Sequence, residues 1–343
     1  MNGAAAGQSH VASGRRALAV LALLCVIAGT AVLLWHAPGT PDVDIWLEWI
    51  RALSASGPID GYRSVASDYP PGASLFLWMA TAVGRGANVD PRLSLKILLF
   101  TFLLLTTGVT LAGSRRAGIA LLIHLSTCVS AMGLMYLDIL TAPFLVGAIW
   151  AAMANMPFLM MSGLVLAALI KWQPLILLPF AAAHVLKRAP AISTGSLWLR
   201  VALAIVPAVL ILGVYGTPVV ESLYRASRHT TLSSFAANFP WLLTWWFGRG
   251  SEARLESGGT MAIVYASRVT LRLLSLLMLI AYGSLLRMYW KRGSASSADW
   301  IRFSLLGYWA YAVISAGAHE NHLFAASLLA VGLAWSNARE LPL

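Results

Sequence analysis

Two aspartates near the start of the chain are the residues best suited to acid–base chemistry. Asp42 and Asp44 lie one residue apart in a polar stretch that follows the first long apolar run. A carboxylate pair at this spacing can act as a general base or bind a divalent cation, and the alternative is a solvated loop start. A third carboxylate, Asp68, comes directly before Tyr69 and two prolines, which fix an extended entry into a short apolar run.

Further polar residues lie at the edges of later apolar runs or in the polar loops beside them. Ionisable groups at such edges are costly to place and usually have a function. Arginine binds phosphate through paired hydrogen bonds and lysine binds it as a point charge, so the cations are candidates for a phosphate site. For Lys171 the alternative is that its amine reaches out to water. The residues of this kind are Asp138, Lys171, Gln173, Arg225, Arg228, Asn238 and Arg268.

A histidine-containing stretch near the C-terminus resembles a zinc motif but has the wrong spacing. Zinc metalloproteases place two histidines four residues apart on one helix face, whereas His319 and His322 are three apart and no third ligand is evident. We therefore expect no metal here. Together with Glu320, these residues are better suited to binding phosphate or sugar hydroxyls. The two cysteines, Cys25 and Cys128, lie in apolar runs and are expected to be small core residues.

The composition is that of a membrane protein. Of the 343 residues, 59% are hydrophobic and only 11% are charged, whereas soluble domains carry about 25% charged residues. The net charge of +11 would favour nucleic-acid binding in a soluble protein. Here most Lys and Arg residues fall in short loops between apolar runs, as the positive-inside rule describes. We therefore expect a protein surrounded by membrane lipids that does not bind nucleic acid.

The apolar runs predict a single all-α domain over residues 1–343, a polytopic transmembrane bundle with about ten spans and both termini in the cytoplasm. Two long outer loops, 36–92 and 216–262, are expected to carry short juxtamembrane helices, because the apolar run 72–84 is too short to span. This topology places the chemically suited residues on the outer face. The expected spans with two stated ends are 17–35, 93–112, 117–136, 139–154, 197–215, 266–286 and 300–316. Three more are expected: one from the turn at 155–157 to Lys171, one from the break at 171–174 to Lys187 and Arg188, and a last helix after His322.

In this order along the chain, the motifs resemble those of the GT-C superfamily of polyprenyl- and dolichyl-phosphate-sugar glycosyltransferases. The pair Asp42 and Asp44, followed by Asp68-Tyr69-Pro70-Pro71-Gly72, is similar to the first-loop signature of the mannosyltransferases in this group. The later motifs that carry the resemblance are Tyr136-Leu137-Asp138, Lys171-Trp172-Gln173-Pro174, Ala237-Asn238-Phe239-Pro240-Trp241 and Ala318-His319-Glu320-Asn321-His322-Leu323-Phe324.

The resemblance implies an inverting glycosyltransferase in the bacterial inner (cytoplasmic) membrane, with its active site on the periplasmic side. It would transfer mannose, or another hexose or pentose, from a polyprenyl-phosphate donor to a lipid-linked or glycan acceptor. Asp44 is the favoured general base and Asp42 the alternative; a divalent cation at the pair is possible, and no other cofactor is implied. The expected donor-binding residues are Asp68, Tyr69, Asp138, Lys171, Gln173, Arg225, Arg228, Asn238, Arg268, His319, Glu320 and His322.

Two other functions fit a membrane protein with these residues. A transporter or flippase of lipid-linked sugars would also carry charges at membrane depth, but it should show repeat symmetry and broken helices at the midplane. The sequence has no detectable repeat, which favours an enzyme. A non-catalytic assembly subunit is the third alternative, and it predicts that Asp42 and Asp44 can be neutralised without effect.

Overall fold

The structure is a computed structural model, and it describes residues 3–188, 194–228, 231–234, 238–240, 242, 263–265, 267–293, 296–318 and 320–340. Its elements in chain order are α1 (Gly3–Leu34), α2 (Asp42–Val65), α3 (Pro71–Gly86), α4 (Pro91–Ser114), α5 (Ala117–Cys128), η1 (Val129–Gly133), η2 (Leu137–Thr141), α6 (Ala142–Met153), α7 (Pro157–Ala168), η3 (Gln173–Leu177), α8 (Leu178–Arg188), α9 (Thr194–Tyr215), α10 (Thr217–Ala226), β1 (Thr231–Ser234), β2 (Ile263–Tyr265), α12 (Arg268–Lys291), α13 (Ser297–Ile314), η5 (Glu320–Leu323) and α14 (Phe324–Glu340).

Helices make up nearly all of the described structure, which confirms the predicted helical class. The exception is one short antiparallel ladder, in which β1 pairs with β2 and Ser234 lies opposite Ile263. This ladder was not predicted. The first outer loop folds as the two helices α2 and α3, in agreement with the expected short helices. Of the aromatic stretch expected at residues 239–246, only three residues lie within the described structure.

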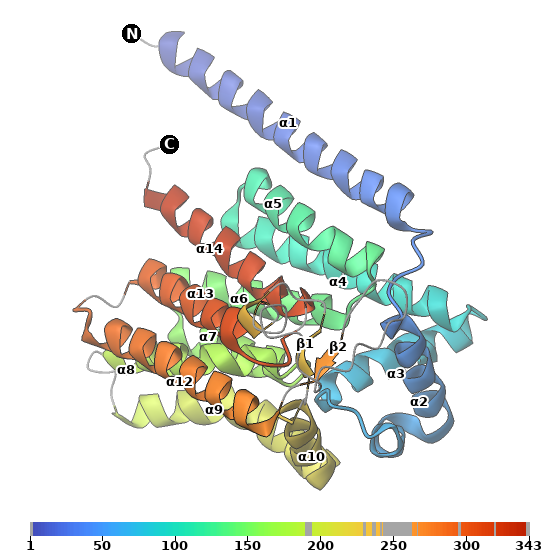
Figure 1. Cartoon of the computed structure of the whole chain (residues 1–343). Helices are drawn as coiled ribbons and strands as arrows, with labels where there is room; N and C mark the ends of the chain where they lie inside the picture. The colour runs from blue at the N-terminus through green and yellow to red at the C-terminus, as the bar shows by residue number, and fades with distance from the viewer. Residues whose placement is uncertain are drawn as a thin grey trace.

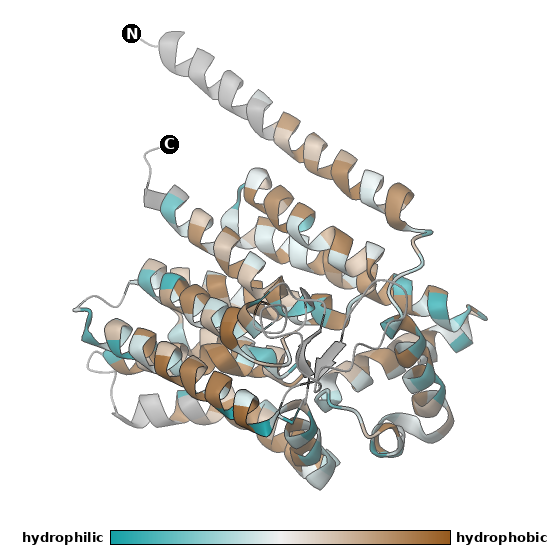
Figure 2. Ribbon diagram, viewed as in Figure 1, coloured by the Kyte–Doolittle hydropathy of each residue, from teal (hydrophilic) through white to brown (hydrophobic). Residues whose placement is uncertain are grey.

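Several helices of the bundle begin or end on the same side of the molecule. Helix α1 begins, α14 ends, and α12 turns into α13 on the left of the molecule, whereas α2, α3 and α10 lie on the opposite side (Figure 1). Hydrophilic residues gather at both sides, and the middle of α12 is mostly hydrophobic (Figure 2). Helix α4 packs against α5 and α6, α6 packs against α7, and α13 packs against α12 and α14. The buried core runs through these middle segments.

Fewer helices than the expected ten are long and apolar enough to be identified as membrane spans from length and composition alone. Within the described residues, three helices are long and apolar enough to cross a membrane, at Ala17–Leu34, Pro91–Ser114 and Arg268–Lys291. A fourth would be the pair Ala202–Tyr215 and Thr217–Ala226, which is bent by 106°. Several other apolar helices have only 12 residues, for example α6 and α7, and reach about 18 Å of the roughly 30 Å hydrocarbon core. The count of ten therefore stays a prediction.

The helix expected over 117–136 is interrupted before its end. Helix α5 stops at Cys128 and continues as one π-helical turn, η1. Met135 then takes a positive φ of 59°, and Tyr136 is extended with ψ of 140°. Because these dihedral angles are not helical, the chain turns before η2 and α6 begin. Irregular backbone at membrane depth is tolerated only where protein or a water-filled cavity surrounds it, and here Met135 and Leu137 are buried in the core.

Helix α1 is held to the bundle by polar contacts at two places. The imidazole of His124 in α5 lies 3.0 Å from the hydroxyl of Thr30 in α1 and 3.0 Å from that of Thr107 in α4. Beyond the end of α1, the buried amine of Lys96 donates to the carbonyl of Ala37 at 2.7 Å and to that of Trp35. The lysine thereby pairs with carbonyls that have no partner within the helix. The rest of α1 is largely exposed.

Gly72 explains why the Pro-Pro-Gly motif opens α3. The amide of Gly72 donates to the carbonyl of Leu169 at the end of α7 over 2.8 Å. A Cβ at position 72 would lie 2.4 Å from that same carbonyl oxygen, which is closer than any real contact. Pro70 is extended, as expected from the proline that follows it. The motif therefore brings α3 against the segment that carries Lys171.

Gly72→Ala is expected to lower the free energy of unfolding by about 1–3 kcal/mol, because backbone atoms of Leu169 would have to move. Gly86→Ala at the other end of α3 is the matched control, since its added Cβ meets nothing within 4 Å. It should change stability by no more than about 0.5 kcal/mol. Thermal unfolding in detergent compares the two variants. Equal stability would show that α3 does not depend on this close approach.

Candidate functional site

A buried ion pair forms the centre of the candidate site. Lys171 follows the end of α7, and its amine lies 2.7 and 2.8 Å from the two carboxylate oxygens of Asp138 in η2. Each residue is only 5% exposed. Two buried charges are tolerated when they compensate each other with good hydrogen-bond geometry, as they do here. Lys171 therefore points into the protein, and the alternative in which its amine reaches out to water does not apply.

Tyr69 covers this ion pair from the first loop. Its ring centroid is 5.4 Å from the Lys171 amine, a distance that allows a cation–π contact. On its other sides the ring makes edge contacts with Trp46 and Trp49 of α2, at 5.4 and 5.6 Å between centroids. Burial, followed by the charges of Asp138, Asp68 and Asp42, raises the pKa of the Tyr69 phenol well above its usual value. The phenol therefore stays protonated at neutral pH and remains a hydrogen-bond donor.

The two aspartates of the first loop lie on different faces of α2. Asp42, Trp46 and Trp49 follow helical spacing and share the face that packs on Tyr69. Asp42 is half-buried there, and its charge is felt by the Tyr69 phenol. Asp44 is exposed, because residues two apart on a helix do not face each other. Of the two, Asp42 is the carboxylate on the side of α2 that meets Tyr69.

Helix α10 holds the loop that carries Asp68. Arg225 donates two hydrogen bonds to the carbonyl of Ser67, at 3.1 Å from Nε and 2.9 Å from Nη2. The Tyr62 hydroxyl donates to the carbonyl of Tyr69 at 3.0 Å. These bonds fix the backbone on both sides of Asp68. The guanidinium of Arg225 therefore lies next to Asp68, and it orders the loop in addition to any role in binding an anion.

A second polar group surrounds His322. One of its members, Gln173, lies two residues after Lys171 in the sequence. The amide nitrogen of Gln173 lies 2.9 Å from Nε2 of His322, and Nδ1 of His322 lies 3.2 Å from the hydroxyl of Tyr311. The Tyr311 and His322 rings are stacked with centroids 5.7 Å apart. Nearby in sequence to Tyr311, the carbonyl of Ala312 accepts a hydrogen bond from the buried Asn238 amide at 3.4 Å. This group therefore brings together η3, α13 and η5.

Comparison with known proteins shows which solved structure has a similar fold. No family model matches the chain, and neither does any curated protein. Among solved structures, the chain is similar to the crystal structure of ArnT from Cupriavidus metallidurans bound to undecaprenyl phosphate. The superposition has a TM-score of 0.51 with 16% identity, over 97% of this chain and 61% of the ArnT chain. The chain has an ArnT-like fold.

The similarity to ArnT shows the fold and no more, because the identity is low. The expected fold is confirmed to the extent that this helical chain shares the fold of ArnT. The chain spans about 61% of the length of ArnT. The undecaprenyl phosphate in that crystal structure is a ligand of ArnT and is not assigned to this chain by the similarity in fold.

Some expected site residues are not brought together by this ArnT-like fold. Arg228 is exposed and stacks on Tyr224, with its guanidinium carbon 3.9 Å from the ring centroid. Arg268 is exposed at the first position of α12. His319 lies outside the described residues, and for Glu320 only the backbone, at the start of η5, is described. Among the described residues, no three His, Cys, Asp or Glu side chains form a group able to hold a metal ion.

Three aromatic residues of the site were missed by the sequence analysis. Trp46 and Trp49 were not among the expected site residues, yet both are buried against Tyr69. Their helical spacing from Asp42 is the signal that identifies them. Tyr311 lies within an apolar run, where tyrosine is common for other reasons, so the sequence carried no signal for it.

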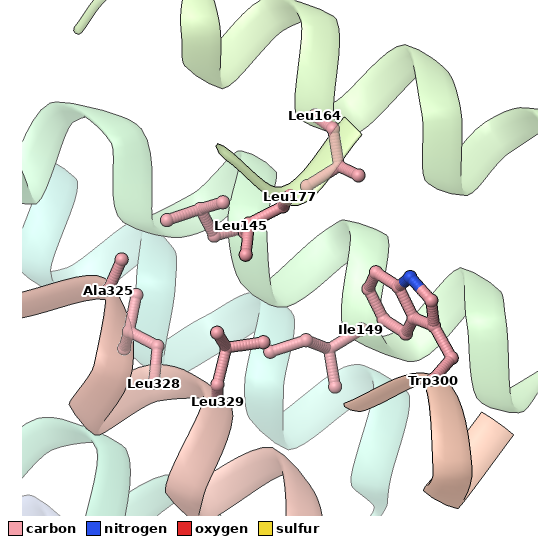
Figure 3. A pocket seen from close by; sticks show the side chains of 8 residues that line it. All are labelled: Leu145, Ile149, Leu164, Leu177, Trp300, Ala325, Leu328 and Leu329. Atoms are coloured by element: carbon pink, nitrogen blue, oxygen red, sulfur yellow. The ribbon is translucent and has the colours of Figure 1, made fainter. Parts of the chain in front are cut away.

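One pocket in the ArnT-like bundle belongs to the core and not to the candidate site. Its lining is almost entirely aliphatic, and the indole of Trp300 is its one polar-bearing side chain (Figure 3). A pocket without charges or convergent polar groups has no means to orient a polar substrate. The lining residues are Leu145, Ile149, Leu164, Leu177, Trp300, Ala325, Leu328 and Leu329.

Proposed function

We propose that the chain is a membrane glycosyltransferase that takes its sugar from a polyprenyl-phosphate donor. The observation that carries this proposal is the buried Asp138–Lys171 pair beneath Tyr69, with Asp42 on the facing surface of α2. The ArnT-like fold supports it, because ArnT was crystallised with undecaprenyl phosphate bound. The order of motifs that resemble the GT-C superfamily gives independent support from the sequence.

The proposed reaction is a single displacement at the anomeric carbon. Asp42 accepts the proton of an acceptor hydroxyl, whose oxygen then forms a bond to that carbon. The bond between the carbon and the phosphate oxygen breaks, and polyprenyl phosphate leaves with the electron pair. The Lys171 amine uses two of its three N–H groups on Asp138. Its third N–H and the Tyr69 phenol donate hydrogen bonds to the phosphate. Displacement from the opposite face inverts the configuration at this carbon.

The finer assignments are also part of the proposal. The donor sugar is mannose or another hexose or pentose, the acceptor is a lipid-linked sugar or glycan, and the reaction takes place on the outer face of a bacterial inner membrane. Asp42 and Asp44 face different directions, so a divalent cation at either one would need other ligands. Transfer measured with and without EDTA decides whether a cation is required.

A radiolabel-transfer assay tests the function. Vesicles containing the full chain are supplied with a panel of polyprenyl-phosphate sugars and a membrane extract that provides acceptors, and label is followed into lipid-linked and glycan products. We expect transfer from one donor of the panel and none from vesicles without the chain. The broken segment before Asp138 is also a feature of transporters. Movement of the labelled lipid across the bilayer without transfer would therefore contradict the enzyme and favour a flippase.

A further inference from the structure

Two amide groups beside His322 present buried oxygens that have no partner. The side-chain oxygens of Gln173 and Asn321 are both buried and accept no hydrogen bond within the described structure. Gln173 uses the other end of its amide for His322. If that amide were rotated by 180°, its nitrogen would become the unpartnered end, so one end is free in either orientation. Buried polar groups in proteins are almost always hydrogen-bonded, so each of these oxygens is an acceptor available to a water molecule or a ligand.

The arrangement around His322 fixes which atoms remain for such a partner. Nε2 of the imidazole faces the Gln173 amide and Nδ1 faces the Tyr311 hydroxyl. If the amide nitrogen of Gln173 donates to Nε2, then Nδ1 carries the proton and donates to the Tyr311 oxygen. The Tyr311 hydroxyl then keeps its own proton for a further acceptor. With the Gln173 amide in this orientation, the group offers two acceptor oxygens and one phenol donor.

This chemistry selects the class of ligand. A phosphate oxygen is an acceptor and is repelled by amide oxygens, so the Gln173 and Asn321 oxygens do not bind it. A hydroxyl group donates to an amide oxygen and also accepts from a phenol, so it matches both kinds of group.

We propose that Gln173, Asn321 and Tyr311 form a subsite for the hydroxyl groups of a sugar ring, separate from the charged pair that compensates the phosphate. Only one residue lies between Lys171 and Gln173 in the sequence, so a donor with its phosphate at Lys171 brings its sugar next to the amide. The inference rests on the proposed function and deepens it. It divides the site into a charged part that recognises the lipid phosphate and an uncharged part that recognises the sugar.

Binding of two lipids to the full-length chain in detergent tests this division. The probes are undecaprenyl phosphate and undecaprenyl-phosphate mannose, and the measured quantity is the ratio of their dissociation constants. Gln173→Met and Asn321→Leu each remove an amide while keeping a similar side-chain volume. Each is expected to weaken mannose-lipid binding by about 5- to 10-fold, the effect of one lost hydrogen bond, and to leave undecaprenyl phosphate binding unchanged. Ser227→Ala, at an exposed hydroxyl bonded within its own turn of α10, is the control.

The outcomes separate the subsite from the function. If both variants bind the two lipids like the unmodified chain, the amides do not contact the sugar and the subsite is wrong. If they weaken both lipids equally, the amides support the fold and the subsite is equally wrong. If the unmodified chain binds neither of these lipids and also binds none of the other sugar lipids of the transfer panel, the proposed function fails together with the subsite. A selective loss for the mannose lipid supports both.

Discussion

Replacing Asp42 by asparagine is expected to lower the rate of sugar transfer by about 10²–10⁴-fold, the usual effect of removing a general base. The amide keeps the shape of the side chain but cannot accept the proton of the acceptor hydroxyl. Asp42 lies on the face of α2 that packs on Tyr69, the residue that covers the ion pair. The initial rate of label transfer at saturating donor measures the effect.

Asp44→Asn is the matched control for this experiment. Asp44 lies two residues further on the same helix, but on the exposed face. Both substitutions remove a negative charge from the first turn of α2, which costs about 0.3–1 kcal/mol of helix stability in either case. The two variants therefore differ mainly in where the carboxylate points. Normal turnover in Asp42→Asn with a large loss in Asp44→Asn would reverse the assignment, and normal turnover in both would remove the pair from catalysis.

Replacing Lys171 by methionine is expected to destabilise the protein by about 3–5 kcal/mol, because it leaves Asp138 as a buried charge without compensation. The double variant Lys171→Met with Asp138→Leu removes both charges and should recover most of the lost stability. Neither variant should transfer sugar, since the cation that compensates the phosphate is absent from both. Thermal unfolding in detergent, measured beside the transfer rate, distinguishes the two effects.

Lys291→Met provides the comparison for a lysine without such a role, because Lys291 is exposed at the end of α12. Its loss should change stability by no more than about 0.5 kcal/mol. A Lys171→Met variant as stable as the unmodified chain would mean that Asp138 is neutral when its partner is absent. A double variant less stable than the single one would mean that the pair is required for packing as well as for charge.

The helices of the bundle were predictable because their ends carry local signals. Helix α4 begins at Pro91, two residues before the expected start, since Asp90 accepts hydrogen bonds from the amides of Arg92 and Leu93 and caps the helix. The interruption after α5 was not predictable, because the positive φ of Met135 is imposed by tertiary packing and not by a glycine. Over residues 117–136, counting by apolar length therefore gave a longer helix than the 12 residues of α5.

The site was predictable as a set of residues but not as a set of contacts. Asp138 and Lys171 were both expected at the outer face, yet the ion pair joins residues 33 apart along the chain and depends on how η2 meets the end of α7. The preference for Asp44 over Asp42 came from its position in the sequence, nearer to Trp46 and Trp49, which were expected to hold it in place. Because the segment is a helix, Asp42 lies on the same face as Trp46 and Trp49, and Asp42 is therefore preferred over Asp44 as the general base.

The hydrogen bonds of His124 have a consequence for how the chain is made. Thr30 and His124 are separated by 94 residues, and a ribosome adds about 5–20 residues per second. Helix α1 therefore resides in the bilayer for roughly 5–20 s before its imidazole partner has been synthesised. During that time its own apolar surface must keep it in the lipid. The first helix thus acts as an independent anchor during biosynthesis, and it joins the bundle only when α4 and α5 arrive.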